Sequence, residues 1–168
     1  PQALCIVNLK RHARSLLDAL RDHHAIRHLS TNLCPAHRRS VIEQVHEALK
    51  QGQDCRLIST QCVEAGVDLD FPLVFRAMAP LEAIAQAAGR CNREGRLTGL
   101  GRVVVFDPAE NVEARRLYPS QAYYQAAEVT RTMLIDEGVL DIGNPDIFTR
   151  YYQRLYDLPV ENLDTSYF

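Results

Sequence analysis

Five short apolar runs, each separated from the next by a segment with helical spacing, constrain the fold of this chain more than any other feature. The runs have the length of strands and are almost continuously apolar, as in strands that are buried on both faces. Strands that alternate with helices in this way form a parallel sheet with right-handed crossovers. We therefore predict an α/β fold, a doubly wound parallel sheet of about five strands. The predicted strands span residues 3–9, 26–30, 56–60, 73–78 and 102–106.

Helical patterns lie between these runs and also continue after them. Beyond about residue 107 the strand pattern stops and only helical spacing follows. We therefore predict a lobe over residues 1–107 and a helical extension, or the start of a linker, over residues 108–168. The predicted helices span residues 11–20, 35–49, 80–93, 121–134 and 145–155.

The composition narrows the possible environment and partners. The net charge is −2, so nucleic-acid binding would require a local basic patch. The five cysteines form no C-x-x-C pair, which indicates free thiols in a reducing cytoplasm. No apolar run approaches the roughly 20 residues that span a bilayer. Because Pro1 directly precedes a predicted strand, we expect the chain to be part of a larger protein.

The segment 86–93, Gln-Ala-Ala-Gly-Arg-Cys-Asn-Arg, contains the clearest chemical pattern. Gln86, Arg90 and Arg93 are spaced i, i+4 and i+7, which would place them on one face of the predicted helix. Two guanidinium groups one turn apart suit a polyphosphate. Gly89 would cost that helix about 1 kcal/mol relative to alanine, which suggests a close approach by a ligand or another backbone. The spacing alone is equally compatible with a solvated basic helix face.

The segment 59–70 begins where the third predicted strand ends. Ser59 and Thr60 place two hydroxyl groups at the end of the strand, and a loop with Gly66 and Asp68 follows. Hydroxyl and backbone N–H groups at such a position can hold a phosphate, and Asp68 can accept a hydrogen bond from a ribose hydroxyl. An ordinary turn with an N-capping acid has the same composition.

Together these segments resemble motifs V and VI of superfamily 2 helicases, in the right order. The particular residues of these segments resemble the CRISPR-associated helicase–nuclease of type I systems: Thr-Gln-Cys-Val-Glu at residues 60–64, Met-Ala-Pro-Leu at residues 78–81 and Gly-Arg-Cys-Asn-Arg at residues 89–93. Residues 6–8 resemble motif IV. The resemblance covers residues 3–106 and implies that the chain is the second RecA-like lobe of the motor.

The resemblance also implies a role for each matching residue. Arg93 would reach the γ-phosphate of ATP, Arg90 would assist it, and Gln86 would orient that network. Gly66, Asp68 and Gly89 would line the nucleotide site. Thr31, Ser59 and Thr60 would hold the backbone of a single-stranded DNA.

Half of the nucleotide site is missing from the sequence. There is no G-x-x-x-x-G-K-[ST] loop, and Lys10 and Lys50 are the only lysines. We therefore expect ATP with Mg²⁺ as cofactor, the Mg²⁺ ligands on a separate first lobe, no metal site in this chain, and no hydrolysis by the chain alone. The metal-dependent nuclease of the resembled family carries a His-Asp signature, which does not occur here.

The partners implied by the resemblance are single-stranded DNA, the first lobe and nuclease domain of the same protein, and a CRISPR surveillance complex. We expect no association with a membrane. Two alternatives stay open at this point. One is the second lobe of another superfamily 2 repair or RNA helicase. The other is a degenerate lobe that serves as a protein-binding scaffold.

Overall fold

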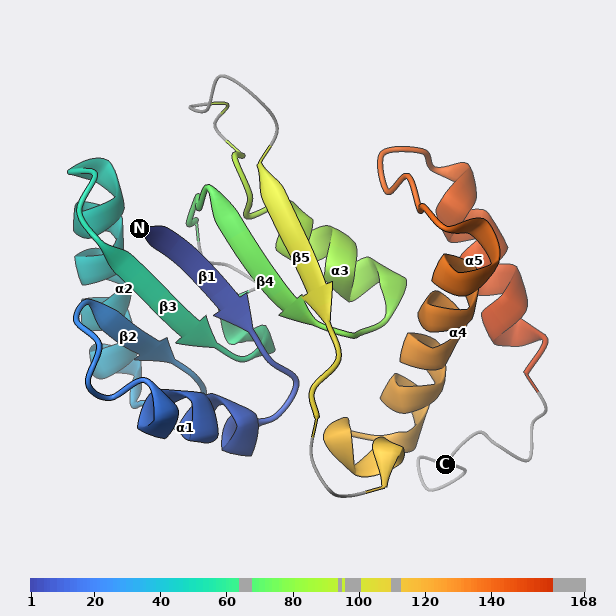
Figure 1. Cartoon of the computed structure of the whole chain (residues 1–168), viewed down its shortest axis with the longest axis horizontal. Helices are drawn as coiled ribbons and strands as arrows, with labels where there is room; N and C mark the ends of the chain where they lie inside the picture. The colour runs from blue at the N-terminus through green and yellow to red at the C-terminus, as the bar shows by residue number, and fades with distance from the viewer. Residues whose placement is uncertain (64–67, 94, 96–100, 110–112, 159–168) are drawn as a thin grey trace. The chain divides into compact units, whose positions relative to one another are not determined.

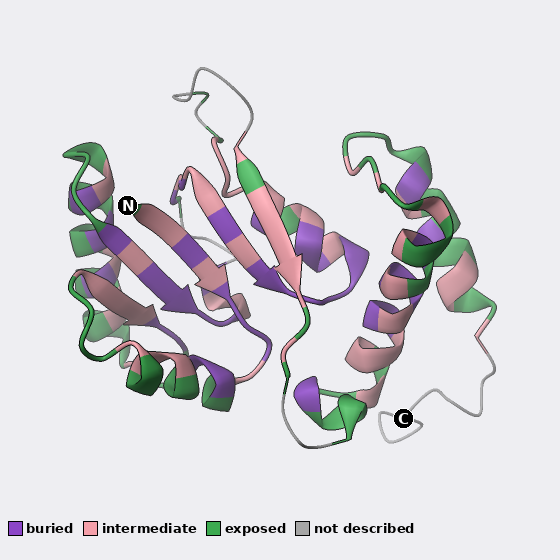
Figure 2. Cartoon of the chain, in the orientation of Figure 1, coloured by how far each residue is buried: buried purple, intermediate pink, exposed green. Residues whose placement is uncertain are grey.

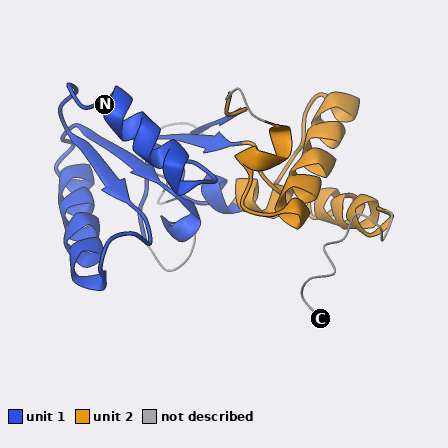
Figure 3. Ribbon diagram, turned by 90° about the horizontal axis from the view of Figure 1, so that it is seen from below, with its two compact units in different colours: residues 1–77, 86–106 blue, residues 78–85, 107–168 orange. Residues whose placement is uncertain are grey.

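The computed structural model describes residues 1–63, 68–93, 95, 101–109 and 113–158. The chain divides into two compact units, one of residues 1–77 and 86–106, the other of residues 78–85 and 107–168 (Figure 3). We predicted one boundary near residue 107. In the structure the chain passes from the first unit to the second after Phe106, and residues 78–85 also belong to the second, helical unit.

The first unit is built on a sheet of five parallel strands in the order β2-β3-β1-β4-β5 (Figure 1). This confirms the predicted α/β class and parallel sheet. The strands are almost continuously apolar because side chains pack against them on both faces of the sheet, in which β1 lies between β3 and β4. The strands are β1 (Gln2–Ile6), β2 (Ile26–Leu29), β3 (Cys55–Ser59), β4 (Leu73–Ala77) and β5 (Arg102–Phe106).

Helices cover both faces of this sheet. Leu4, Ile6 and Leu57 point into one core, where they meet Val41 and Val45 of α2 (Pro35–Lys50). The residues between them in the strands point to the other face, as the alternation of a strand requires. There Cys5 and Ile58 pack with Ala13, Leu16, Leu17 and Leu20, which belong to α1 (Lys10–Ala19) or follow it directly. The buried residues therefore lie along both layers (Figure 2).

Helix α3 is shorter than predicted. It spans Leu81–Ala88, so the predicted continuation to Arg93 is wrong. The backbone turns instead, because Phe71 binds this segment from the side: its N–H donates to Arg90 O at 2.9 Å, and Asn92 N–H donates to Phe71 O at 3.0 Å. Asn92 has a φ of 50°, in the left-handed region that ends a helical path. Gly89 thus lies outside the helix, and the helical penalty expected for it does not apply.

The second unit has its own apolar core between α4 (Gln121–Glu137) and α5 (Asp146–Tyr156). Leu81 from the first turn of α3 packs there with Met133, Ile147 and Tyr151, all nearly or fully buried. This contact explains why residues 78–85 belong to the helical unit. Among the described residues, no helix is both long and apolar enough to cross a membrane.

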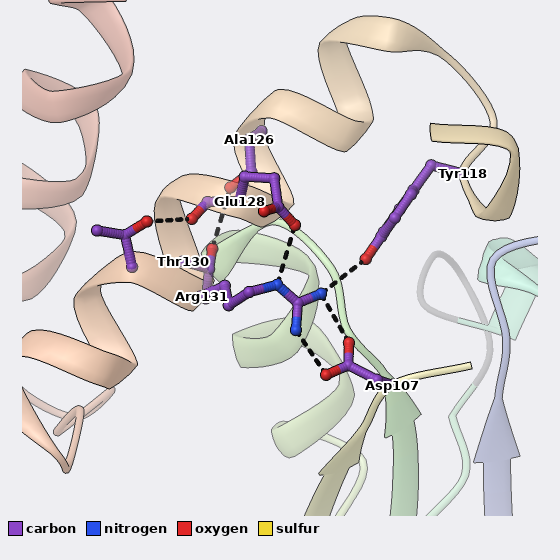
Figure 4. A network of polar contacts seen from close by, with 7 residues as sticks. Asp107, Tyr118, Ala126, Glu128, Thr130 and Arg131 are labelled. Atoms are coloured by element: carbon purple, nitrogen blue, oxygen red, sulfur yellow. Dashed lines mark hydrogen bonds and ion pairs between the residues drawn. The ribbon is translucent and has the colours of Figure 1, made fainter. Parts of the chain in front are cut away.

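Arg131 of α4 organises the polar side of this unit (Figure 4). Its guanidinium holds the carboxylate of Asp107 with two bonds, of 2.5 and 2.7 Å, and donates to Glu128 at 2.9 Å and to the Tyr118 hydroxyl at 3.2 Å. The planar group matches both oxygens of one carboxylate. Arg131 therefore ties the segment that follows β5 to α4.

Met133 and Ile135, two positions apart on α4, provide a test of the apolar packing between α4 and α5. Met133 is fully buried, whereas Ile135 is 76% exposed. We expect Met133→Ala to lower the free energy of unfolding by about 2–5 kcal/mol, because it leaves a cavity. The matched variant Ile135→Ala should change it by less than about 0.5 kcal/mol. Urea denaturation followed by circular dichroism measures both, and equal losses would contradict the packing described.

Candidate functional site

The segment that carries the two arginines is pinned against the start of β4. Phe71, fully buried, pairs through its backbone with Arg90 and Asn92, as a short parallel bridge to Cys91. This pairing returns the chain from α3 to the sheet. It places Arg93 beside the acidic residues that precede Phe71.

Arg93 lies between two of those acids. Its guanidinium donates to Asp68 Oδ1 at 2.6 Å, and its backbone N–H donates to Asp70 Oδ1 at 2.7 Å. The Arg93 side chain is 50% exposed and that of Asp68 is 71% exposed. The guanidinium is therefore oriented by the protein and still accessible to a ligand from solvent.

The other predicted nucleotide residues lie on the same segment but not on one helical face. Gln86 is exposed on α3, whereas Arg90 is half-buried in the turn that follows it. The expected single face of Gln86, Arg90 and Arg93 is therefore wrong, because the helix ends between the first and second of them. Gly89 is exposed in that turn, and Gly66 lies outside the described residues.

Tight packing supports this turn from behind. A side chain at Gly101 would meet Cys91 Sγ at 2.6 Å and the Asn92 Cβ at 2.9 Å, so glycine is needed where the chain enters β5. Burial, with a smaller effect from Asp70, raises the pKa of the Cys91 thiol. Cys91 therefore acts as a packed neutral group rather than as a nucleophile.

A second group of predicted residues lies at the carboxyl ends of the strands. Thr31 is exposed just after β2, whereas Ser59 is fully buried and Thr60 is 5% exposed after β3. The Ser59 hydroxyl lies 2.9 Å from both Leu29 O and Thr60 O, and it donates to one of them at a time. Ser59 therefore shapes this edge from inside, while Thr31 faces solvent.

A hollow of about 480 Å³ opens beside this second group, between β2, α2 and the turn after β3. Arg38 and Arg39 line it together with Cys62. Neither arginine is among the site residues predicted from the sequence, although their position in the first turns of α2 was a usable signal. Burial, and next the neighbouring His37, lower the pKa of His28 on β2, which therefore adds no charge here near neutral pH.

The structure thus separates the predicted residues into two groups. Arg90, Arg93 and Asp68 flank the start of β4, whereas Thr31, Ser59 and Thr60 follow the ends of β2 and β3. Because the strands are parallel, these groups occupy opposite edges of the sheet. One edge presents the Arg93 guanidinium beside acids, and the other presents Thr31 near two further arginines, with Ser59 and Thr60 buried behind it.

Residues 1–96 match the family described as the CRISPR-associated nuclease/helicase Cas3, C-terminal. The chain belongs to this Cas3 C-terminal family. The match contains both edges described above, including Arg93 and Thr60.

Individual Cas3 proteins support the assignment. The CRISPR-associated nuclease/helicase Cas3 of Haloferax volcanii is 46% identical over 84 residues, which cover 49% of this chain and 9% of that protein. In the crystal structure of T. fusca Cas3-ADP, a similar fold (TM-score 0.70, 21% identity) covers 97% of this chain and 21% of that one. A chain of a CRISPR RNA-guided surveillance complex, pre-nicking, matches 98% of this chain with 22% of its own length (TM-score 0.68, 21% identity). The chain thus spans a small part of each of these relatives.

The exposure of the Arg93–Asp68 pair predicts that it contributes little to folding. Exposed ion pairs are worth roughly 0–1 kcal/mol, so Arg93→Ala should lower the free energy of unfolding by no more than about 1 kcal/mol. The backbone bond to Asp70 persists in this variant, which keeps the turn in place. Chemical denaturation of the chain measures the change. A loss above about 2 kcal/mol would show that Arg93 holds the fold and is not free to serve a ligand.

Proposed function

We propose that this chain is the second motor lobe of an ATP-dependent single-stranded DNA translocase that acts in CRISPR interference. The observation that supports this proposal most directly concerns Arg93: two acidic residues orient it, while half of its side chain stays exposed. Membership in the Cas3 C-terminal family supports this role over that of a repair or RNA helicase. The proposed place of action is the cytoplasm, in association with a CRISPR surveillance complex.

In this proposal ATP binds against the edge at the start of β4. Arg93 exchanges the Asp68 carboxylate for an oxygen of the γ-phosphate, because an exposed ion pair is easily replaced. A guanidinium at that position stabilises the charge that develops on the transferred phosphoryl group. Arg90 and Gln86 assist from the same segment, and Asp68 and Gly89 contact the nucleotide; the same role is proposed for Gly66, which lies outside the described residues.

The remaining parts of the nucleotide site come from a first lobe. The Mg²⁺ ligands belong to that lobe in this proposal, because a nucleotide-bound Mg²⁺ needs only one or two carboxylates beside the substrate phosphates. The phosphate-binding loop is absent from the sequence. In this proposal the first lobe supplies both, and the present chain alone does not hydrolyse ATP.

Single-stranded DNA follows the opposite edge of the sheet in this proposal. Thr31 contacts the backbone of the strand directly, and the segment of Ser59 and Thr60 holds the shape of the edge. Arg38 and Arg39, in the adjoining hollow, supply positive charge for the phosphates. Contacts of this kind bind a strand without reading its sequence.

The proposal is tested with Arg93→Ala in the complete helicase that contains this lobe. We expect the rate of ATP hydrolysis at saturating DNA to fall by about 10³–10⁵, as for the loss of an arginine finger. Binding of single-stranded DNA, measured by fluorescence anisotropy, should stay near that of the wild type, because Arg93 lies at the other edge.

A matched control is Arg14→Ala, which removes an arginine that is 80% exposed and also paired with an aspartate, Asp18. It should leave hydrolysis unchanged. Turnover of Arg93→Ala near the wild-type rate would mean that Arg93 is not the finger. Absence of DNA-stimulated hydrolysis in the wild-type protein would instead favour a scaffold without motor activity.

A further inference from the structure

A charged side chain lies fully buried in the middle of the first unit. Arg76, on β4, is 0% exposed and is the largest of the fully buried side chains. Its neighbours across the sheet are Ile6 on β1 and Val105 on β5. A guanidinium keeps its charge in proteins, and burying a charge is costly unless hydrogen bonds compensate. A buried arginine in an apolar strand therefore requires a reason beyond packing.

The hydrogen bonds of Arg76 lead to the loop after β1. Arg76 Nη1 donates to Asn8 Oδ1 at 2.8 Å and to the Ala77 carbonyl oxygen at 3.0 Å. Asn8 is itself 3% exposed. The backbone carbonyl oxygen of Asn8 accepts a hydrogen bond from Gln61 Nε2 at 3.1 Å. Asn8 thus joins the end of β4 to the turn after β3, which contains Gln61 (Gln61–Val63).

This link extends a row of bonds along the carboxyl edge of the sheet. Val7 N–H donates to Ser59 O at 2.9 Å, and Thr60 N–H donates to Leu29 O at 3.3 Å. The row therefore runs from β4 through β1 and β3 to β2, where Thr31 follows. Arg76 occupies one end of it, and the proposed DNA contacts occupy the other.

We propose that Arg76 is a positioning residue for the bound strand, acting through Asn8 and Gln61. The charged group fixes Asn8, Asn8 fixes Gln61, and Gln61 sets the path of the backbone at Thr60. A charged donor makes stronger hydrogen bonds than a neutral one, which suits a group that holds an edge in one conformation. This inference rests on the proposed function, because it concerns the same DNA edge.

Gln61→Ala tests the link most cleanly, because Gln61 is only half-buried and its removal leaves Arg76 and Asn8 in place. In the complete helicase, the single-stranded DNA concentration for half-maximal ATP hydrolysis should rise roughly three- to tenfold, the equivalent of one lost hydrogen bond. The rate at saturating DNA should stay within about twofold of the wild type, since Arg93 is untouched. The melting temperature should be unchanged.

Arg76→Lys is the second variant, and it keeps the charge while losing the fork of donors. It should produce the same rise in half-saturating DNA concentration. When Gln61→Ala and Arg76→Lys are combined, the half-saturating DNA concentration should rise by less than the product of the two single increases, because both substitutions act through Asn8. Gln53→Ala removes another glutamine, exposed and outside the row, and should leave the DNA concentration dependence as in the wild type.

Two results would overturn the inference. One is an unchanged half-saturating DNA concentration in Gln61→Ala. The other is a loss of melting temperature and of maximal rate without any change in DNA dependence, which would leave Arg76 a packing role alone. If the wild-type helicase shows no stimulation by single-stranded DNA, the proposed function fails, and that result is distinct from both.

Discussion

The backbone pairing between Phe71 and the segment of Arg90 to Asn92 determines where Arg93 lies in this lobe. Without this pairing, the helical spacing of the sequence would favour a continuation of α3 beyond Ala88. With it, the chain turns back to the sheet and Arg93 reaches Asp68 and Asp70. Gly101, which has no side chain, leaves room for the partly buried Cys91 thiol beside this turn. The orientation of one guanidinium thus depends on a tertiary contact.

In the proposed function, the two edges of the sheet have different tasks in the motor lobe. At the start of β4 an exposed arginine is oriented by acids. At the carboxyl ends of β1, β3 and β4 the polar groups are mostly buried: Arg76 donates to Asn8, and the Ser59 hydroxyl donates to backbone carbonyl oxygens. An accessible group can exchange partners during a reaction cycle, whereas a buried network resists change. This contrast is consistent with a replaceable nucleotide contact at one edge and a rigid DNA contact at the other.

Much of the fold could be predicted, because it is encoded in local patterns. The five strands and the parallel sheet follow from apolar runs such as that of β5, and the segments of motifs V and VI identified the family. The end of α3 could not be predicted, because Gln86, Arg90 and Arg93 keep helical spacing while Phe71 competes from a distance. The grouping of residues 78–85 with the second unit depends on the packing of Leu81 against α4 and α5. The role of Arg76 was equally hidden, although a single arginine inside an apolar strand was its visible signal.

The most direct test of the central claim is a structure of the complete helicase with a non-hydrolysable ATP analogue and Mg²⁺. We expect the guanidinium of Arg93 to leave Asp68 and to lie within about 3 Å of an oxygen of the γ-phosphate, while its backbone N–H still binds Asp70. An Arg93 that stays on Asp68, with the γ-phosphate contacted from other parts of the protein, would contradict it.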